Sequence, residues 1–431
     1  MTKQINRSRL FWIGVLGLFT AATSASLRAG VAGQLKGELF DALSAGGSGA
    51  GALTGEALGA SFLGFALTLF VASPFLDLIG MRRMLIGAAG CFIAGTLLVI
   101  EAGALASGMN VFHLVWVGML LCGIGWGAVE ATINPMTTAL YPDDKTSRLN
   151  RLHAWWPAGL VAGGLASALL GQIGLGWRGM LSLSLLLALG MLIFSAGSAF
   201  PLTERAASGI SMRDMFAEIV KKPGFLIWFG AMFLTAATEL APGQWVDVAL
   251  SHRVGMRGIL LLVYVSLIMF VLRHFAGLLA HRLNNAGLLW LSSLLACGGL
   301  LMLSAAQSPL AAILAATVWG AGVCFMWPTM IASVAELYPR GGSWMIGLMG
   351  SAGALSIYLV LPKLGGLYDQ ARLELAGGAT QLAALSPSAL QLIEDRAASA
   401  TFQSLALIPA VLLVVFGMVW RWNRKHSKTP Q

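Results

Sequence analysis

Charged side chains are scarce in this chain. Aspartate, glutamate, lysine and arginine together make up 10% of its 431 residues, whereas 57% are hydrophobic, and the mean hydropathy is +0.80. A soluble domain of average composition carries about 25% charged residues, so an ordinary soluble protein is excluded. Chains of this composition bury their apolar surface against lipid. We therefore expect an integral membrane protein.

Sequence motifs of enzymes and metal sites are also missing. The four cysteines lie inside apolar segments, without the C-x-x-C spacing of zinc or redox sites, at Cys91, Cys122, Cys297 and Cys324. Isolated cysteines of this kind pack as small hydrophobic residues. The chain also lacks a Walker-type phosphate loop and the H-E-x-x-H and G-x-S-x-G motifs. We therefore predict neither an enzyme nor an ATP-driven pump, and we expect no cofactor and no metal.

Basic residues outnumber acidic ones, 27 to 18, which gives a formal net charge of +9. They are scattered between apolar runs rather than clustered, and this pattern does not favour nucleic-acid binding. If the N-terminus is cytoplasmic, most lysines and arginines fall on the cytoplasmic side, as the positive-inside rule requires. The distribution predicts a multi-pass protein of the inner or plasma membrane with both termini in the cytoplasm.

Twelve apolar runs approach the roughly 20 residues that a helix needs to cross a bilayer. The polar stretch 201–224 is predicted as a cytoplasmic linker between an N-terminal bundle, residues 1–200, and a C-terminal bundle, residues 225–431. A second polar stretch, 368–399, is predicted as an extracytoplasmic insertion in which Pro387 starts a short helix. The predicted spanning helices are 10–31, 56–76, 84–104, 111–138, 152–170, 179–200, 225–246, 258–280, 286–306, 310–337, 344–365 and 400–420.

Short motifs recur in the same order in the two halves of the chain. T-A-A-T occurs at residues 20–23 and 235–238, and L-Y-P occurs at 140–142 and 337–339. Each match is weak in a chain rich in alanine and glycine, but their shared order indicates an internal repeat. Parallel repeats imply a site between the halves, near the middle of the membrane. We therefore predict an all-α integral membrane fold with 12 transmembrane helices in two pseudo-symmetric six-helix bundles.

Glu130 stands out because it is a carboxylate inside the apolar run 111–138. A charged group in a spanning helix costs at least about 2.5–3.5 kcal/mol, so such residues are functional candidates. In a surrounding of low dielectric constant, a carboxyl group can exchange a proton within the physiological pH range. Glu130 is therefore the first candidate for proton coupling. The alternative is a structural carboxylate that is held permanently by a partner on the first or fifth helix.

Two further polar residues belong to this candidate site. Asn134 follows Glu130 by one helical turn on the same face, where it could position the carboxyl group or substrate hydroxyls, or serve helix packing. His153 stands at the start of the fifth apolar run, and histidine titrates near neutral pH. His153 is thus a second candidate for proton coupling, although a histidine near a helix end is also a common structural residue.

The candidate solute contacts are polar or aromatic residues within the apolar runs. Arg28 could pair with Glu130, anchor an anionic group or reach the outer surface by snorkelling. Glu239 and Gln244 flank a Pro-Gly interruption of the seventh run, and such interruptions often mark transport sites. Tryptophan rings can stack on sugars or anchor helices at the membrane interface, and two adjacent tryptophans cannot both face inward. The tryptophan candidates are Trp155, Trp156, Trp245 and Trp327.

The stretch S-P-F-L-D-L-I-G-M-R-R, residues 73–83, resembles the signature G-x-L-x-D-x-x-G-R-R/K between helices two and three of the major facilitator superfamily. The resemblance implies that Asp77, Arg82 and Arg83 close the cytoplasmic side of a transporter as a gate. A plain positive-inside loop is the alternative. The matching positions are Asp77, Gly80, Arg82 and Arg83, and the departing ones are Ser73 and Met81.

The motif E-A-T-I-N-P at residues 130–135, together with Trp-Pro-Thr at 327–329, resembles the fucose/proton symporter branch of that superfamily. The branch carries E-x-x-x-N-P in its fourth helix and F-P-T in its tenth. The chain departs from the branch at Ser26–Ala29, where the branch has an aspartate, and at His153 and Trp156, where it has glutamine and asparagine. The resemblance implies uptake of a sugar together with a proton.

These observations predict a secondary active transporter that works as a monomer in the lipid bilayer, with a small polar, sugar-like solute and protons as its partners. The predicted mechanism is alternating access with proton symport. The predicted gate also includes Glu336 and Arg340, beside the inner end of the tenth run. Two alternatives stay open: proton-driven efflux of amphipathic compounds, and a membrane protein that senses or modifies a solute without transporting it.

Overall fold

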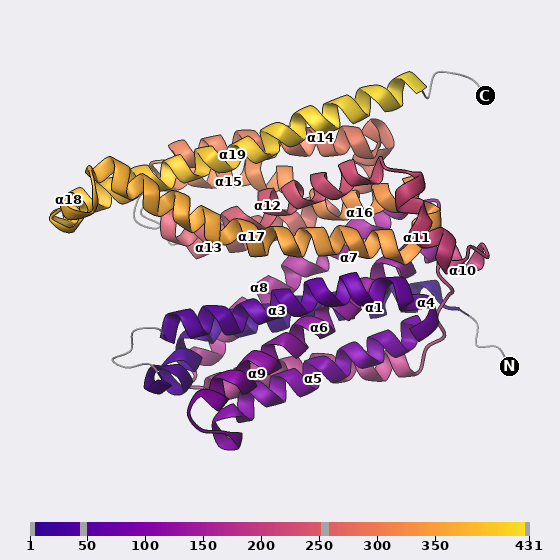
Figure 1. The fold of residues 1–431 in the computed structure, drawn as a ribbon, viewed down its shortest axis with the longest axis horizontal. Coiled ribbons are helices and arrows are strands. Elements are labelled where there is room, and N and C mark those ends of the chain that lie inside the picture. The colour runs from indigo at the N-terminus through magenta and orange to yellow at the C-terminus, as the bar shows by residue number, and fades with distance from the viewer. Residues whose placement is uncertain (1–4, 44–49, 251–257, 427–431) are drawn as a thin grey trace. The chain divides into compact units, whose positions relative to one another are not determined.

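A computed structural model describes residues 5–43, 50–250 and 258–426, and every regular element within these ranges is helical (Figure 1). The helices of the first half are α1 (Arg7–Gly30), α2 (Ala32–Leu35), η1 (Lys36–Phe40), η2 (Asp41–Leu43), α3 (Ala50–Ala72), η4 (Ser73–Phe75), α4 (Leu76–Ile79), α5 (Met81–Leu105), α6 (Met109–Leu140), α7 (Lys145–His153), α8 (Trp155–Gln172) and α9 (Trp177–Ala196). The remaining helices are α10 (Glu204–Ala207), α11 (Met212–Lys221), α12 (Phe225–Leu250), α13 (Gly258–Arg273), α14 (Ala276–Ala305), α15 (Pro309–Val323), α16 (Met326–Leu337), η5 (Pro339–Gly341), α17 (Gly342–Ala376), α18 (Ala379–Ala383) and α19 (Pro387–His426).

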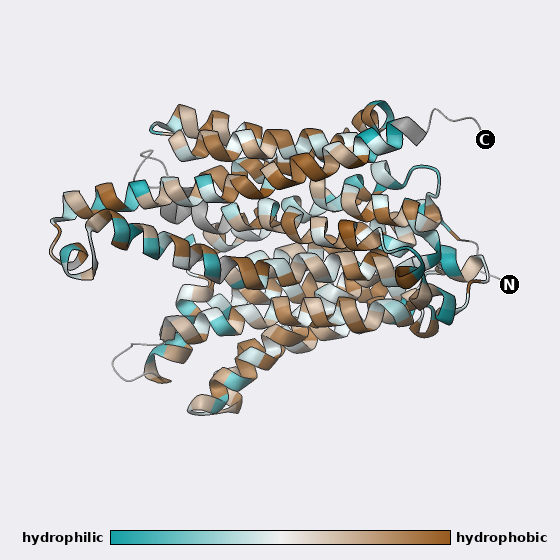
Figure 2. Cartoon of the chain, turned by 45° about the horizontal axis from the view of Figure 1, so that its top comes forward, coloured by the Kyte–Doolittle hydropathy of each residue, from teal (hydrophilic) through white to brown (hydrophobic). Residues whose placement is uncertain are grey.

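Within the described residues, eleven helical segments are long and apolar enough to cross a membrane, and α13 is a shorter apolar helix. Together they correspond in chain order to the twelve predicted runs. In Figure 2, hydrophilic residues gather mainly toward the helix ends, while the middle stretches are largely hydrophobic. The prediction of an all-α membrane fold is confirmed.

The fifth and tenth segments are divided more finely than the hydrophobic pattern predicts. The fifth begins at Lys145 rather than at residue 152, because the polar helix α7 continues into α8 with only a break at Ala154. The tenth consists of α15 and α16, which meet at Cys324 and Phe325. Hydropathy does not register the second break, since the residues around Cys324 and Phe325 stay apolar.

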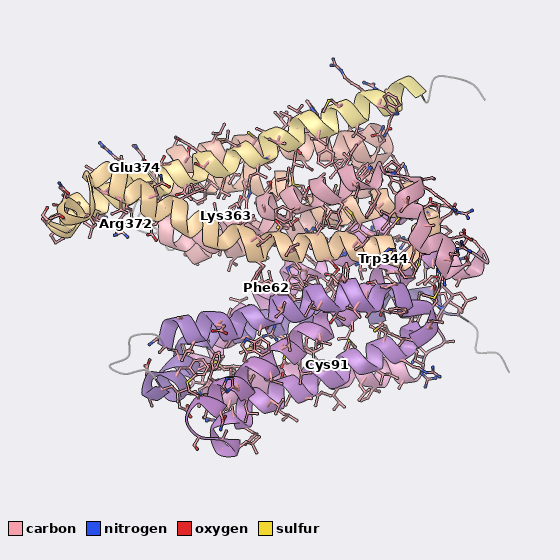
Figure 3. The ribbon with its side chains drawn as sticks, in the orientation of Figure 1. Phe62, Cys91, Trp344, Lys363, Arg372 and Glu374 are labelled. Atoms are coloured by element: carbon pink, nitrogen blue, oxygen red, sulfur yellow. The ribbon has the colours of Figure 1, made fainter. Side chains whose placement is uncertain are left out.

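Residues 368–399, predicted as an insertion with one short helix, form the ends of two long helices that are joined by α18. The last helix begins at Pro387, as predicted, and then continues through the final span, because neither glycine nor proline occurs between Pro387 and Pro409. The two arms are linked by Arg372, whose Nη2 lies 3.0 Å from Glu394 Oε1. Figure 3 shows Arg372 near the far end of α17.

The chain divides into two compact units. Unit 1 comprises Met1–Leu226 and Val334–Leu355, and unit 2 comprises Ile227–Ser333 and Ser356–Gln431. In unit 1, α6 packs against α3 and α5, and α1 packs against α8 and α9 (Figure 1). A Cβ atom at Gly123 would lie 2.0 Å from the carbonyl oxygen of Ser61, so the close approach of α6 to α3 requires a glycine there. The predicted division into bundles 1–200 and 225–431 stays a prediction.

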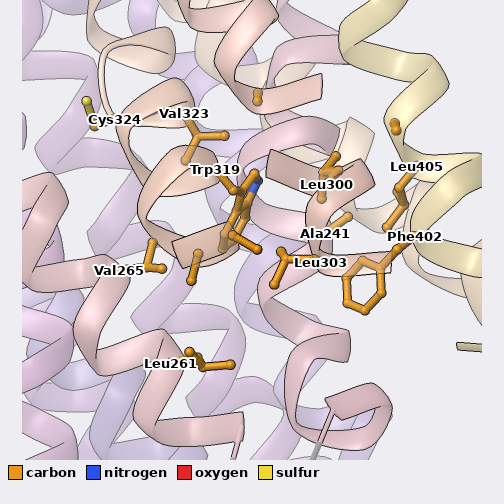
Figure 4. Packing of buried hydrophobic residues seen from close by; sticks show 14 of the residues in the cluster. Ala241, Leu261, Val265, Leu300, Leu303, Trp319, Val323, Cys324, Phe402 and Leu405 are labelled. Atoms are coloured by element: carbon orange, nitrogen blue, oxygen red, sulfur yellow. The ribbon is translucent and has the colours of Figure 1, made fainter. Parts of the chain in front are cut away.

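The core of unit 2 forms around Trp319 of α15 (Figure 4). Leu300 of α14 and Phe402 of α19 belong to the same buried cluster. A Cβ atom at Gly322 would lie 2.3 Å from the backbone nitrogen of Ala296, so α15 and α14 meet backbone to backbone, as small residues allow between membrane helices.

The L-Y-P repeat has matching backbone geometry in its two copies. Tyr141, directly after α6, has φ −133° and ψ 64°, and Tyr338, directly after α16, has φ −129° and ψ 55°. The N–H of Tyr141 donates to the carbonyl of Thr137 at 3.0 Å, and that of Tyr338 donates to Val334 at 2.9 Å. The two helix ends therefore close in the same way.

Candidate functional site

Three of the predicted site residues form one hydrogen-bonded chain in unit 1. The amide nitrogen of Asn134 donates to Glu130 Oε2 at 2.9 Å, and the amide oxygen of Asn134 lies 2.9 Å from His153 Nε2. All three side chains are buried, each 3% exposed. The structure thus brings together both proton-coupling candidates, Glu130 and His153, through the amide that the sequence placed one turn from Glu130. We call these three residues the proton site, although their role in proton coupling stays a prediction here.

Local helix chemistry positions this chain of groups. Pro135 follows Asn134 inside α6 and cannot donate a backbone hydrogen bond. The Asn134 side chain also donates to the backbone carbonyl of Glu130 at 3.1 Å, which fixes the amide against its own helix. His153 is the last residue of α7, where the break at Ala154 lets its ring approach α6.

An aromatic stack lies one turn before Glu130. Trp126 is stacked between Phe65, at a centroid distance of 3.9 Å, and Trp156, at 4.6 Å. Its indole nitrogen is buried and has no hydrogen-bond partner among the described residues. Trp155 instead packs edge-on against Trp12, at 5.6 Å. The two adjacent tryptophans therefore pack against different helices, and the expectation that only one of them faces inward stays a prediction.

Trp126, which lies between two glycines of the G-I-G-W-G stretch, is not among the site residues predicted from the sequence. The spacing could have identified it, since Trp126, Glu130 and Asn134 follow one another at intervals of four and share a helix face. An unsatisfied buried N–H costs about 1–3 kcal/mol, so the Trp126 edge is poised to donate to an oxygen that the described residues do not provide.

Arg28 is buried in α1, 5% exposed, and its Nη1 donates to Ser24 Oγ one turn earlier at 2.6 Å. It is therefore not a snorkelling residue. The pairing of Arg28 with Glu130 that we considered is absent from the ion pairs of the described residues.

Glu239 of α12 is held in unit 2 by a buried ion pair. Arg273 Nη2 lies 2.8 Å from Glu239 Oε1, and Arg273 Nε donates to the carbonyl of Cys324 at 2.5 Å. The pair thus ties α12 and α13 to the break between α15 and α16. Trp327 is buried there, whereas the side chains of Gln244 and Trp245 lie outside the described residues.

Of the three residues predicted to form a gate in the first half, Asp77 is joined to the polar stretch 201–224. Asp77 Oδ2 accepts hydrogen bonds from Arg205 Nε, at 2.9 Å, and from Arg205 Nη2, while Thr203 Oγ1 donates to Asp77 Oδ1 at 2.7 Å. Arg82 and Arg83 are exposed. In the part of the chain that the structure describes, neither arginine takes part in an ion pair with Asp77.

The other gate candidates contact α7 and the linker. Lys145 Nζ lies 2.9 Å from Glu204 Oε2 and donates to the carbonyl of Ala335 at 3.2 Å. Thr146 Oγ1 donates to Glu336 Oε1 at 3.1 Å. Arg340 Nε lies 3.8 Å from Glu218 Oε2. We call this set the gate cluster; its members are Asp77, Lys145, Thr146, Thr203, Glu204, Arg205, Glu218, Glu336 and Arg340.

The linker members of the gate cluster were missed by sequence reasoning, because a polar stretch between apolar runs suggests a solvated connector. A signal was nevertheless present. Ser211 and Asp214 have the spacing of a helix start, and the Ser211 hydroxyl accepts from the Asp214 N–H at 3.1 Å. The helix that follows, α11, buries Met215 and Glu218. A carboxylate on the apolar face of an amphipathic helix indicates a partner.

Comparison with known proteins identifies the class of protein. The model of the Major Facilitator Superfamily matches residues 7–361, so the chain belongs to this superfamily of membrane transporters. The resemblance inferred from the signature at Asp77 is thereby confirmed. No curated protein matches the chain.

Solved structures of the same fold include two sugar symporters. The Escherichia coli fucose:proton symporter FucP is 16% identical, with 95% of this chain and 98% of that chain covered and a TM-score of 0.70. The proton:xylose symporter XylE is 15% identical over 95% and 94%, with a TM-score of 0.71. The human organic anion transporter MFSD10 is 14% identical over 96% and 100%, with a TM-score of 0.67. At these identities the likeness concerns the fold.

Proposed function

We propose that the chain is a secondary active transporter that carries a small polar solute, in the first place a sugar, together with a proton by alternating access. The observation that carries this proposal is the proton site, in which buried Glu130 is linked through Asn134 to His153. FucP and XylE, which share the fold, are sugar:proton symporters by name. Their low identity makes the site the main support.

Asn134 can form a hydrogen bond with Glu130 in either charge state of the carboxyl group. An amide can donate to a carboxylate through its NH₂ group, and after rotation it can accept from a carboxylic acid through its oxygen. The hydrogen bond between the two residues can therefore persist whether Glu130 is ionised or protonated. His153 is the residue type whose charge changes near neutral pH, and it could pass the proton onward.

The stack of Trp126 and Trp156 suits the solute. Both faces of Trp126 are covered by other rings, so Trp126 offers its N–H edge, while Trp156 is half-buried and offers a ring surface. Sugar hydroxyls accept hydrogen bonds and sugar C–H faces pack on aromatic rings. The further solute contacts that we propose are Arg28, Asn134, Glu239, Gln244, Trp245 and Trp327.

The proposal places the gate cluster on the cytoplasmic side of the cell membrane, with both chain termini on that side and the monomer as the working unit. Its support is the positive-inside distribution of basic residues. Arg82 and Arg83 are exposed at this end and would meet water or lipid head groups.

Proteoliposomes that contain a pH dye test the proposal. A panel of hexoses, pentoses and polyols is added to wild type, to Glu130→Gln and to the matched control Glu101→Gln, whose carboxylate is exposed on α5. We expect one sugar to acidify the lumen with wild type and the control but not with Glu130→Gln. Sugar flux without acidification would contradict the role of Glu130. Binding without flux would contradict transport.

Export of amphipathic compounds is the second candidate, because a three-ring stack and the buried cation Arg28 also suit an aromatic anion. The name of MFSD10, an organic anion transporter, accords with it. If no sugar on the panel moves, the second experiment uses vesicles of the opposite membrane orientation with an imposed proton gradient. It measures whether aromatic acids and dyes accumulate in them. Proton-driven accumulation there would replace uptake by export.

A further inference from the structure

The short helix α7 contacts the proton site with one end and the gate cluster with the other. It comprises nine residues, Lys145–His153, and at about 1.5 Å per residue it spans roughly 13 Å. Asn150 Nδ2 donates to the carbonyl of Thr146 at 2.9 Å, which braces the helix internally. Helices of this length move as rigid bodies, so a displacement at one end reaches the other.

At the C-terminal end of α7, the protonation of Glu130 decides what His153 can bond. In the observed orientation the amide oxygen of Asn134 faces His153 Nε2, so Nε2 must carry a hydrogen, and Glu130 Oε2 must accept. When Oε2 takes up a proton, it becomes a donor and the amide must turn over. Its NH₂ group then faces His153, whose Nε2 can accept only when its hydrogen has moved to Nδ1 of the ring or to water; otherwise this bond is lost.

At the N-terminal end, Lys145 and Thr146 hold the end of α16. Lys145 Nζ bonds the carbonyl of Ala335 and Glu204, and Thr146 bonds Glu336. Lys145 is buried, with its side chain 9% exposed. A buried ammonium is costly to leave without these partners, so a shift of α7 must move the end of α16 with it or exchange its bonds.

Other charged groups around α7 do not explain a response near neutral pH. The arginines keep their charge throughout, and Glu56 and Glu101 are exposed. Glu38 of η1 is paired with Arg178, and Glu204 and Glu336 are tested by substitution below. The charged side chains on α7 and on the unit 1 helices packed against α6 or α7 are Arg7, Arg9, Arg28, Lys36, Glu38, Glu56, Arg82, Arg83, Glu101, Lys145, Arg148, Arg151, Glu204 and Arg205, and to these come Glu130 of α6 itself and Glu336, which Thr146 contacts.

We propose that Lys145 and Thr146 are positioning residues of the transport cycle, through which α7 transmits the protonation of Glu130 to the gate cluster. Proton uptake by Glu130 turns the Asn134 amide, changes the bond to His153 and moves α7, and the contacts of Lys145 and Thr146 with residues 335–336 change in response. The inference rests on the proposed proton site, but it does not depend on which solute is carried.

Backbone hydrogen exchange of the full chain in lipid nanodiscs tests the link without a solute. Protection is compared at about pH 5.5 and about pH 8, on either side of the histidine range, after correction for the intrinsic exchange rate. In wild type we expect residues 145–153 and 334–338 to differ by about fivefold or more between the two conditions. Glu130→Gln should abolish the difference in both segments.

Variants at the N-terminal end of α7 distinguish a role in transmitting the protonation of Glu130 from a purely structural role. Lys145→Gln should keep the pH response near His153 and lose it at residues 334–338, and Thr146→Val provides the same test if Lys145→Gln does not fold. In proteoliposomes, Lys145→Gln should weaken the dependence of uptake on the pH gradient more than the flux down a solute gradient. A structural role would lower both equally.

Three results would overturn the inference. A full pH response in Glu130→Gln, or its complete loss in Glu204→Gln or Glu336→Gln, would place the titrating group elsewhere. A wild type whose α7 shows no pH response, while liposomes show proton-coupled uptake, would separate α7 from coupling and leave the proposed function intact. Loss of both fluxes in equal measure in Lys145→Gln would assign Lys145 a structural role.

Discussion

Both units bury a carboxylate within a spanning helix, but they hold it with different chemistry. Glu130 of α6 accepts from the neutral amide of Asn134, and Glu239 of α12 accepts from the guanidinium of Arg273. The two side chains are similarly buried, with 3% and 7% exposed. Burial therefore does not distinguish the two carboxylates, but the chemistry of their hydrogen-bond partners does.

A guanidinium stabilises only the ionised carboxylate, and its own burial depends on that charge. An amide serves both forms of a carboxyl group. We therefore interpret Glu239 and Arg273 as a fixed pair that fastens α12 and α13 to the break at Cys324, and Glu130 as the group that changes charge. Sequence alone ranks the two glutamates alike, because both are acids in apolar helices.

The largest expected effect comes from breaking the fixed pair. Arg273→Met leaves Glu239 buried without its cation, and we expect the free energy of unfolding to fall by about 3–5 kcal/mol. Titration of the purified protein with a denaturing detergent measures this loss. The double variant Arg273→Met/Glu239→Gln should recover most of it. If single and double variants unfold alike, the pair is not what stabilises unit 2.

Removing the amide should cost less. Asn134→Leu takes away the donor to Glu130 and the acceptor for His153, and a buried group left unsatisfied costs about 1–3 kcal/mol. Combining it with His153→Phe in a double-mutant cycle tests whether the three groups act as one chain. Strictly additive losses would show that the hydrogen bonds of Asn134 are independent of each other.

Neutralising Glu130 should abolish proton-driven uptake while lowering the free energy of unfolding less than the two changes above. Glu130→Gln keeps an oxygen acceptor for Asn134, so we expect a change in the free energy of unfolding of about 1 kcal/mol or less, with proton-driven uptake lost. Glu239→Gln should show the opposite pattern in stability, because Arg273 would remain buried without a counter-charge. Equal losses of stability in the two variants would refute the contrast between the carboxylates.

Bilayer physics explains how much of this arrangement could be predicted. The spanning helices follow from apolar length alone, and the contact between Glu130 and Asn134 follows from helical spacing. The repeat of L-Y-P was likewise visible, and its two tyrosines have matching backbone geometry.

The rest depends on tertiary packing, which a single sequence does not encode visibly. His153 reaches Asn134 only because α7 folds back against α6 after the connector at residues 141–144. The pairing of Asp77 with Arg205 joins residues 128 positions apart. Cross-chain contacts of this kind need either coordinates or a set of related sequences.

A third carboxylate separates the effect of the partner from that of burial. Glu38 of η1 is held by an arginine, as Glu239 is, but 48% of its side chain is exposed. Arg178 Nη1 lies 2.6 Å from Glu38 Oε1, and the Trp177 indole donates to Oε2 at 2.6 Å. The Trp177 hydrogen bond first, and Arg178 second, lower the pKa of Glu38 below its ordinary value of 4.5.

Because the pKa of Glu38 is lowered in the folded state, its stabilisation is present above pH 4.5 and is lost as the pH falls through the lowered pKa. Solvent screening should keep it below about 1 kcal/mol. Unfolding of wild type and Glu38→Gln is compared from about pH 7 to about pH 3, and we expect the gap between them to close in acid. A gap that is constant with pH would assign Glu38 to packing. A gap as large as that of Arg273→Met would show that an arginine partner suffices without burial, and the contrast with Glu130 would then rest on the amide alone.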